Sequence, residues 1–257
     1  MYLYRDLIDF IFTHKGNHKL SLNLGLTYEQ YNVDELQQKL LPIKDKIKGR
    51  AIYLYKDDRL IRLSVFHNHY FSLVMVNNYP ILEIDGIRMH VFYYKSPFKY
   101  AQAVVKHMNI SKKDYVLETC FGQGYITRLL RTNVVAYEKN KGVLEIAKLN
   151  PYSSYLFNKE NVHIVNEDIF NLKQYGFTKI IHDPPSIRVA PELYSPEFYK
   201  LLFKHSVKHT LLYHYIGNTY KKRFNTFKER IIENLFKSGW RLLTYNHKLK
   251  ALFLKKP

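Results

Sequence analysis

Hydrophobic and polar positions follow two different patterns along the chain, and the change falls near residue 95. Up to that point, short apolar runs alternate with pairs of turn-forming residues such as Asn77-Asn78. Runs of this length and punctuation are typical of strands joined by hairpin turns. We therefore predict that residues 1–95 form a small, mainly β domain with one or two helices, including one that Asp34 caps and that runs to about Ile47.

Beyond residue 95, helical periodicity alternates with short apolar strands. The strand signals cover residues 115–117, 134–137, 162–165, 179–182, 210–216, 240–245 and 249–254. Alternation of strands and helices predicts a parallel sheet with helices on both faces. The last two signals pair as a hairpin, which puts one antiparallel strand into the sheet. We predict an α/β domain with a seven-stranded sheet over residues 96–257.

The net charge of +18 is concentrated toward the C-terminal end of the chain. Residues 197–257 contain 14 Lys and Arg but 3 Asp and Glu, whereas residues 1–95 contain 13 and 10. A basic surface attracts phosphate backbones, so this distribution favours a nucleic-acid partner. A compositional origin is the alternative, because the chain is rich in Lys, Ile, Asn and Tyr, as heat-adapted proteins tend to be.

Composition excludes several classes of protein. Cys120 is the only cysteine, which rules out an internal disulfide and a cysteine-based zinc site, and we predict no metal. No run approaches the roughly 18–20 uncharged apolar residues that a membrane span needs, so we expect no membrane partner. The start of the chain carries acids early and lacks the basic segment and apolar core of a signal peptide, which predicts a cytoplasmic protein.

A glycine-containing turn follows the first strand of the second domain. The segment Val116-Leu-Glu-Thr-Cys-Phe-Gly-Gln-Gly-Tyr-Ile-Thr127 contains Gly122 and Gly124 and leads into a helical pattern over residues 125–131. Glycines let a backbone approach a ligand closely, and the first turn of a helix supplies free N–H donors. The segment therefore predicts a ligand-binding loop, with an ordinary tight turn between strand and helix as the alternative.

Acidic residues stand at the ends of two further strands. Glu138 ends the strand after the glycine turn, and Asp168 ends the next one, followed by the apolar pair Ile169-Phe170. A carboxylate in the first position can accept both ribose hydroxyls of a nucleoside, and apolar side chains after the second can cover an adenine. Each acid alone can also be a solvated strand end, but the spacing of the set favours a nucleoside site.

Two prolines follow the fourth strand, in the segment Asp183-Pro184-Pro185-Ser186. Proline cannot donate to a sheet ladder, so the strand must end here. The rigid loop would fix the Asp183 carboxylate and nearby carbonyl groups, which can hold an amino group or the edge of a purine. A rigid loop without chemistry is the alternative. We interpret His182, just before it, as a buried histidine with satisfied nitrogens, and a proton acceptor is the alternative role.

Taken in order, these motifs resemble those of the class I, Rossmann-like S-adenosylmethionine-dependent methyltransferases over residues 96–257. The resemblance implies a seven-stranded methyltransferase sheet with an antiparallel last strand and S-adenosyl-L-methionine as the cofactor. It is closer still to an uncharacterised archaeal methyltransferase family with an Asp-Pro-Pro motif. The segments that carry it are residues 84–90, 116–125, 137–140, 180–186, 192–195 and 197–199.

The resemblance also implies which residues bind the cofactor. They are Glu118, Cys120, Gly122, Gly124, Glu138, Lys139, Asp168 and Ile169. In such enzymes the first acid orients the glycine loop and the methionine end of the cofactor, and the glycines pack against it. The acid after the second strand holds the ribose, and the acid after the third strand contacts the adenine together with its apolar neighbour.

The predicted acceptor-binding residues are Asp183, Pro184, Pro185, Ser186, Lys221, Lys222 and Arg223. The last three are predicted from their charge and their place after a strand, and a solvated start of a helix is the alternative for them. The first three face the methyl acceptor in the enzymes of this resemblance and are the implied catalytic residues. The serine stands where many enzymes that methylate base amino groups have a stacking aromatic residue, and the basic run is predicted to contact phosphate. Methylation at pyrimidine C5 usually needs a cysteine nucleophile, and Cys120 lies within the cofactor loop, so we favour a base nitrogen.

We therefore predict an S-adenosylmethionine-dependent methyltransferase that modifies a base nitrogen of structured RNA, either tRNA or rRNA. The Ile84-Asp85-Gly86 turn before a Rossmann-like domain also resembles spermidine-synthase-like aminopropyltransferases, which use decarboxylated S-adenosylmethionine. A polyamine site needs several carboxylates, however, and residues 197–257 contain 3 acids. The same fold is also compatible with a protein methyltransferase and with an RNA-binding scaffold that has no activity.

Overall fold

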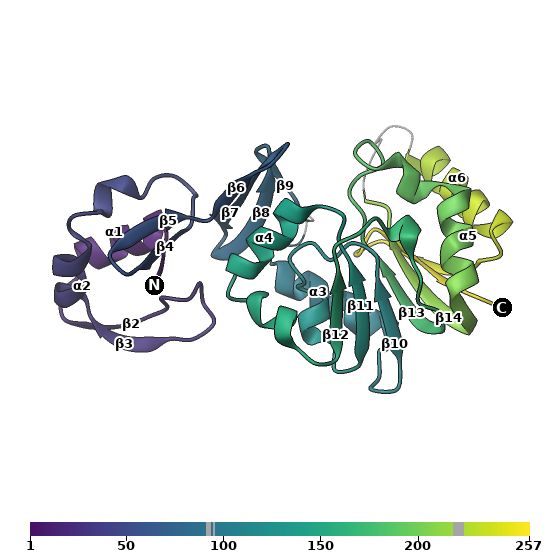
Figure 1. The fold of residues 1–257 in the computed structure, drawn as a ribbon, viewed down its shortest axis with the longest axis horizontal. Helices are drawn as coiled ribbons and strands as arrows, with labels where there is room; N and C mark the ends of the chain where they lie inside the picture. The colour runs from purple at the N-terminus through teal and green to yellow at the C-terminus, as the bar shows by residue number, and fades with distance from the viewer. Residues whose placement is uncertain (91–93, 95, 218–223) are drawn as a thin grey trace. The chain divides into compact units, whose positions relative to one another are not determined.

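The computed structural model describes residues 1–90, 94, 96–217 and 224–257, which form two units (Figure 1). The first unit contains residues 1–97 together with 142–155, and the second contains residues 98–141 together with 156–257. The sequence placed residues 142–155 in the second domain. They belong to the first unit because Tyr152 donates its hydroxyl to the Leu24 carbonyl oxygen at 3.0 Å, and because Gly142 leaves room for a phenylalanine ring of the first unit.

The first unit is mainly β, as predicted, and has three small sheets of strand order β1-β4-β5, β2-β3 and β6-β7-β8-β9. Its elements are β1 (Tyr2–Leu3), α1 (Arg5–Thr13), β2 (Asn17–Leu20), β3 (Glu29–Asn32), α2 (Val33–Leu40), η1 (Lys44–Lys46), β4 (Tyr53–Lys56), β5 (Arg59–Arg62), β6 (Ser64–Phe66), β7 (Tyr70–Val76), β8 (Tyr79–Ile84) and β9 (Ile87–Arg88). The predicted hairpin turn at Asn77-Asn78 is confirmed, and both residues have positive φ angles, of 51° and 65°. Asparagine tolerates this left-handed conformation better than most residues, so the local sequence and the turn agree.

The helix predicted to begin at Asp34 differs in both of its ends. Asn32 is the cap of α2, because its side chain accepts hydrogen bonds from the backbone N–H groups of Asp34 and Glu35. The helix ends at Leu40 rather than near Ile47. Pro42 lies two residues beyond that end, and it has no backbone N–H to continue the helical hydrogen bonds.

The second unit contains one sheet of seven strands. The elements from residue 97 onward are α3 (Pro97–Met108), β10 (Tyr115–Glu118), η2 (Thr127–Leu129), β11 (Asn133–Tyr137), α4 (Lys141–Leu149), η3 (Ser154–Asn158), β12 (Val162–Val165), η4 (Ile169–Asn171), β13 (Phe177–His182), η5 (Pro191–Tyr194), α5 (Pro196–His205), β14 (Ser206–Tyr215), α6 (Phe224–Lys237), β15 (Arg241–Asn246) and β16 (Ala251–Lys255). Of these, α4 after its first residue and the start of η3 belong to the first unit. The strand order is β12-β11-β10-β13-β14-β16-β15. β16, the last strand of the chain, runs antiparallel to both β14 and β15, and the other neighbouring strands are parallel, so the predicted Rossmann-like sheet with an antiparallel last strand is confirmed.

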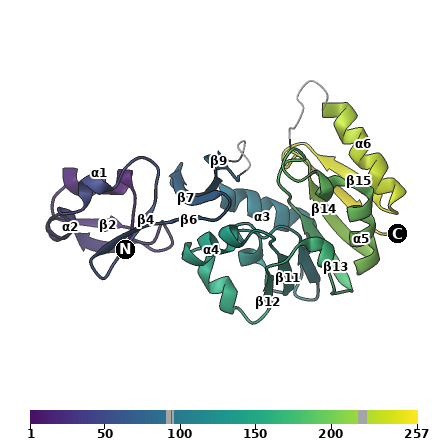
Figure 2. The ribbon, with the colours of Figure 1, turned by 45° about the horizontal axis from the view of Figure 1, so that its top comes forward.

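Helices cover both faces of this sheet. Tyr213 and His214 are successive residues of β14, so their side chains point to opposite faces. The Tyr213 hydroxyl meets the hydroxyl of Tyr100 on α3, and His214 Nε2 meets the hydroxyl of Tyr199 on α5. Helices α5 and α6 lie side by side on the second of these faces (Figure 2).

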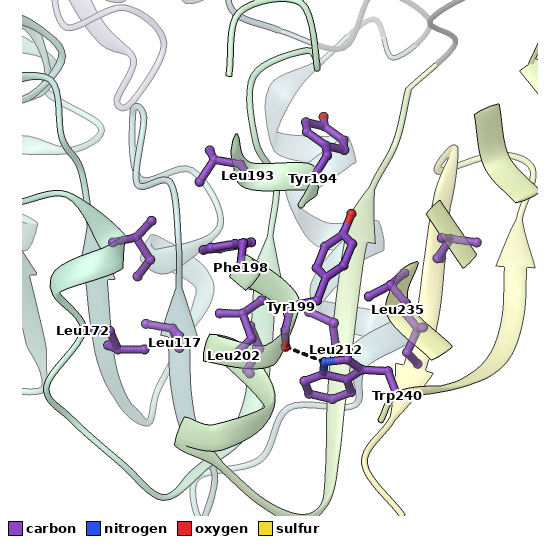
Figure 3. Close-up of a cluster of buried hydrophobic side chains, with 14 of the residues drawn as sticks. Leu117, Leu172, Leu193, Tyr194, Phe198, Tyr199, Leu202, Leu212, Leu235 and Trp240 are labelled. Carbon is purple, nitrogen blue, oxygen red and sulfur yellow. Dashed lines mark hydrogen bonds between the residues drawn. The ribbon is translucent and has the colours of Figure 1, made fainter. Parts of the chain in front are cut away.

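The core between α5, α6 and the sheet is continuous and apolar. It includes Leu117, Phe198, Leu202 and Leu212, each fully buried, and Figure 3 shows them together. Trp240 lies in the same cluster, where its indole N–H donates to the Tyr199 carbonyl oxygen at 3.0 Å. This core packs α5 against β13 and so positions the loop of residues 183–195 that joins them. None of the described helices has the length and apolar character needed to cross a membrane.

The helix predicted over residues 125–131 does not form, and that prediction was wrong. The segment contains only η2, a single short turn of 3₁₀ helix. Thr127 turns its hydroxyl toward the Glu118 carboxylate, and β11 begins at Asn133, so the chain has no room for a longer helix. The helical N–H donors expected after the glycine loop are therefore absent from this segment, and the N–H groups of Phe121, Gly122 and Gly124 are bonded within the protein.

Candidate active site

Three carboxyl groups converge at one edge of the sheet. Glu118 ends β10, Glu138 follows β11 and Asp183 follows β13. These strands are parallel neighbours, so their carboxyl ends meet at the same edge. Burial, together with the nearby charges of Asp183 and Glu138, raises the pKa of Glu118 from 4.5 to about 8. The three carboxyl groups, which the sequence placed at three strand ends, thus lie close enough to influence one another's charge.

The glycine loop is fastened to the Glu138 carboxylate. The Gly122 N–H donates to Oε2 and the Asn140 N–H donates to Oε1, both at 3.0 Å. Burial raises the pKa of Glu138, while these two N–H groups act to lower it. Each carboxylate oxygen accepts one hydrogen bond from the loop. Each can accept a further hydrogen bond from a ligand, such as one that carries two vicinal hydroxyl groups.

The two loop glycines are required for different reasons. Both have positive φ angles, +55° at Gly122 and +63° at Gly124. A β-carbon added to Gly124 would lie 2.5 Å from the Phe121 ring and 2.8 Å from Leu156, whereas one added to Gly122 meets no atom within 4 Å. Gly124 therefore serves the packing of the loop, and Gly122 borders open space beside Glu138.

The first acid is held by a threonine that the sequence did not single out. Glu118 is 2% exposed, and the Thr127 hydroxyl donates a hydrogen bond to its carboxyl group. That hydrogen bond lowers the pKa of Glu118, but it does not offset the effect of burial. A carboxyl group with a pKa near 8 is largely protonated at neutral pH and ionises when a cation arrives beside it.

The acid after the third strand is paired with a predicted neighbour. Lys139 Nζ lies 2.7 Å from Asp168 Oδ2, and the Phe170 N–H donates to Oδ1 at 3.0 Å. Partial burial acts to raise the pKa of Asp168, but Lys139 and this N–H outweigh it and hold the pKa low. Ile169 is buried directly after it, so the apolar and charged positions expected around an adenine lie together.

Asp183 is bonded to a tyrosine from the helix at the start of the domain. Burial raises the pKa of Asp183 from 3.8 to about 7, while a hydrogen bond from the Tyr100 hydroxyl lowers it. The Tyr100 and Tyr213 oxygens are 2.7 Å apart. Because the Tyr100 hydroxyl donates its hydrogen bond to the carboxylate, its oxygen accepts the hydrogen bond from the Tyr213 hydroxyl. The carboxyl group thus titrates near neutral pH at the end of a buried chain of hydroxyl groups.

The two-proline loop is tied down by η5. The Tyr194 hydroxyl donates to the Pro185 carbonyl oxygen at 2.8 Å, and His182 Nε2 donates to the Leu193 carbonyl oxygen at 3.0 Å. The Thr119 hydroxyl lies 2.7 Å from His182 Nδ1, which must accept because Nε2 carries the proton. Burial lowers the pKa of His182 to about 3. Its neutral ring is a structural support, in agreement with the interpretation from the sequence.

The remaining predicted residues occupy varied positions. Burial raises the pKa of the Cys120 thiol far above its usual value, so a thiolate nucleophile is disfavoured there. Ser186 is exposed, and its carbonyl oxygen accepts the N–H of Val189 at 2.8 Å, which closes a turn after the prolines. The basic run of residues 221–223, Lys221, Lys222 and Arg223, lies outside the described residues. Among the described residues, no three His, Cys, Asp or Glu side chains are grouped to hold a metal ion.

Three residues that support the site were missed from the sequence. Thr127 and Tyr194 lie within or beside the motifs, and each bonds a group nine residues earlier in the chain, a separation that no regular helix or strand pattern predicts. Nothing in the sequence points to Tyr100, because a tyrosine on the apolar face of an amphipathic helix is expected to be an ordinary core residue. Only the packing of α3 against the sheet brings it to Asp183.

Known proteins resemble this chain in sequence and in fold. The uncharacterized protein MJ1233 of Methanocaldococcus jannaschii is 37% identical over 197 residues, 74% of this chain and 68% of that protein. Spermidine synthase from Thermotoga maritima superposes with a TM-score of 0.57 at 16% identity, over 80% of this chain and 72% of that chain. TYW2 of M. jannaschii, in complex with AdoMet, matches with a TM-score of 0.46 at 14% identity, over 74% and 86%. No family model matches the chain.

Proposed function

The chain belongs to the family that includes the uncharacterized protein MJ1233 of M. jannaschii, and we propose that it is an S-adenosylmethionine-dependent methyltransferase. One observation carries the proposal: Glu118, Glu138 and Asp183 meet around the glycine loop at the carboxyl edge of a Rossmann-like sheet. Buried carboxyl groups with raised pKa values favour a cationic ligand, and S-adenosylmethionine carries both a sulfonium and an ammonium group.

The residues around the loop fit this cofactor. Glu138 has acceptor capacity for the ribose hydroxyls, and the open space at Gly122 admits a ligand beside it. Asp168 and buried Ile169 suit the adenine, and Glu118 suits the cationic methionine end. The cofactor supplies a methyl group activated by the sulfonium, so the protein needs to contribute alignment and a dry site.

Asp183 has the properties of an acceptor-orienting base. In its ionised form it accepts a hydrogen bond from the N–H of an acceptor nitrogen, while Tyr100 holds the carboxylate in place. With a pKa of about 7, it can also take up the proton that the nitrogen loses. Pro184 and Pro185 keep this carboxylate and the adjoining carbonyl groups rigid, and Tyr194 fastens the loop from the other side.

The proposed acceptor is a base nitrogen of structured RNA, in tRNA or rRNA. The support is the charge of residues 197–257, which contain 14 basic and 3 acidic residues and belong to the same domain as Asp183. Ser186 and the basic run of residues 221–223 are the proposed substrate contacts. Within this proposal the seven-stranded sheet and its loops within residues 96–257 carry the catalysis, residues 1–95 belong to a separate N-terminal unit that also takes in residues 142–155, and the protein works in the cytoplasm.

A methyl-transfer assay tests the proposal. The purified protein is incubated with S-adenosylmethionine labelled in its methyl group and with total RNA from an organism that lacks the gene. We expect nuclease-sensitive label, lost in Asp183→Asn and retained in Asp57→Asn, which makes the same change in an exposed turn. Label in protein rather than RNA would redirect the proposal to a protein methyltransferase, and cofactor binding without any transfer would contradict it.

A second candidate is an aminopropyltransferase. The spermidine synthase fold match covers 80% of this chain, a larger share than residues 96–257 make up, so it extends into the first 95 residues. At 16% identity this shows the fold alone. Incubation with decarboxylated S-adenosylmethionine and putrescine distinguishes the two, because formation of spermidine would favour this candidate over methyl transfer.

A further inference from the structure

A groove lies beside the two-proline loop, and we propose that it binds the nucleotide next to the one that is methylated. Its volume is about 480 Å³, within the range of small-ligand sites. Residues of η5, the start of α5 and one side of α6 form its walls, among them Tyr194, Phe227, Arg230 and Asn234. This inference rests on the proposed function, since it names a further contact of the same RNA.

The groove is joined to the acceptor loop through Tyr194. The ring of Tyr194 lines the groove, and its hydroxyl donates to the Pro185 carbonyl oxygen at 2.8 Å. Ile187, which follows the prolines and Ser186, also lines the groove. A base held at Asp183 therefore has its flanking nucleotide within reach of this groove, because successive nucleotides are only one backbone unit apart.

The lining has the chemistry that single-stranded RNA needs. Phe227 is half-buried and offers its ring to an unstacked base, while the buried Tyr194 ring, 6.4 Å away between centroids and inclined by 50°, supports it from behind. Arg230 is exposed and, although Glu233 on the same helix attracts it, forms no salt bridge within the described part of the chain, so its guanidinium can bind a phosphate. The amide of Asn234 can donate to and accept from a base edge.

The charge of the groove favours a nucleotide over a cationic occupant. None of the residues that line it is acidic, and Arg230 is its charged member. It belongs to the segment 197–257, where basic residues exceed acidic ones by 14 to 3. A polyamine or a basic peptide would meet repulsion here, whereas an anionic backbone would be attracted.

Binding of a fluorescent hexauridylate to the full chain, followed by anisotropy at several salt concentrations, tests the groove. We expect Arg230→Ala to weaken binding at least about fivefold and to reduce the salt slope by about 0.7, the contribution of one single-strand phosphate. Phe227→Ala should weaken binding at least about fivefold without changing the slope. Should Phe227→Ala fail to fold, Phe227→Leu keeps an apolar side chain and removes the aromatic face.

Two matched variants serve as controls. Arg241→Ala removes an exposed arginine from β15, and Phe236→Ala removes a phenylalanine of α6 that is 72% exposed; neither lines the groove. Equal losses for Arg230→Ala and Arg241→Ala, or for Phe227→Ala and Phe236→Ala, would overturn the groove as the site. Specific losses in the absence of RNA methylation would support the groove while rejecting the proposed function, so the two failures are distinguishable.

Discussion

The backbone N–H of Gly122 donates to the Glu138 carboxylate at 3.0 Å, across neighbouring strands of the sheet. This bond fixes the glycine loop and the acid as one unit, because Asn140 holds the other carboxylate oxygen at the same distance. The carboxylate is therefore oriented before any ligand arrives, and a β-carbon at Gly122, whose N–H holds it, would meet no atom within 4 Å.

We predict that Glu138→Gln loses affinity for S-adenosylmethionine. A glutamine amide offers one oxygen where the carboxylate offers two, so one of the two N–H donors faces an NH₂ group. A hydrogen bond to a charged group contributes about 1.5–3 kcal/mol, so we expect the Kd to rise at least about tenfold. Calorimetric titration measures this, with the exposed Glu167→Gln as control; equal affinities in both variants would show that Glu138 holds no part of the cofactor.

Alanine at the two loop glycines should have separable effects. Each substitution strains a left-handed residue by about 1–2 kcal/mol. Gly124→Ala adds a clash with the Phe121 ring at 2.5 Å and should destabilise the fold by a further 1–3 kcal/mol or so. Gly122→Ala meets no protein atom, so its stability cost stays near the strain alone while cofactor binding falls. Urea unfolding and cofactor titration of both variants check this, and a reversed order of stabilities would contradict it.

Glu118 should make the cofactor-free protein less stable at alkaline pH. Its pKa is about 8 in the folded chain and near 4.5 when unfolded, so folding favours the protonated form. The stabilisation is complete below pH 4.5 and is lost as the pH rises to about 8. Each unit of pKa difference corresponds to about 1.4 kcal/mol. Glu118→Gln should therefore flatten the dependence of unfolding free energy on pH between about 5 and 8, and an unchanged slope would refute the assignment.

Cofactor binding should be linked to the same ionisation. A cationic ligand beside Glu118 favours the carboxylate, so the wild-type protein should release a proton when it binds S-adenosylmethionine near pH 7. Calorimetry in two buffers of different ionisation enthalpy measures the number of protons released. We expect a clear release in the wild type and a smaller one in Glu118→Gln; identical values would place the proton elsewhere.

Tyr100→Phe should shift the pH profile of methyl transfer. The hydrogen bond from Tyr100 lowers the pKa of Asp183, which is about 7, and its loss raises that pKa. Because the ionised carboxylate is the active form, the acidic limb of the rate profile should move to higher pH by about one unit. Tyr213→Phe, which removes only the hydroxyl behind Tyr100, should shift the limb less. Equal shifts would mean that the effect comes from packing rather than from the bond to Asp183.

The sequence by itself determined the strands of the second domain and the acids at their ends. The alternation of apolar and polar residues and the positions of turn residues are local properties, and the pair Pro184-Pro185 ends β13 because neither residue can donate to the sheet. Parallel connection then brings the ends of such strands to one edge, so the neighbourhood of Glu118, Glu138 and Asp183 followed from topology. The tight turns, such as Asn77-Asn78, followed from the residues within them.

Only the tertiary structure decided which side chains support these acids. Tyr100 reaches Asp183 and Thr127 reaches Glu118 because α3 and the glycine loop pack where they do, and neither contact has a period or a spacing in the sequence. The same packing replaced the expected helix after Gly124 with a 3₁₀ turn and moved residues 142–155 to the first unit. Local patterns report the preferences of the backbone, whereas these contacts depend on how whole elements bury their surfaces against one another.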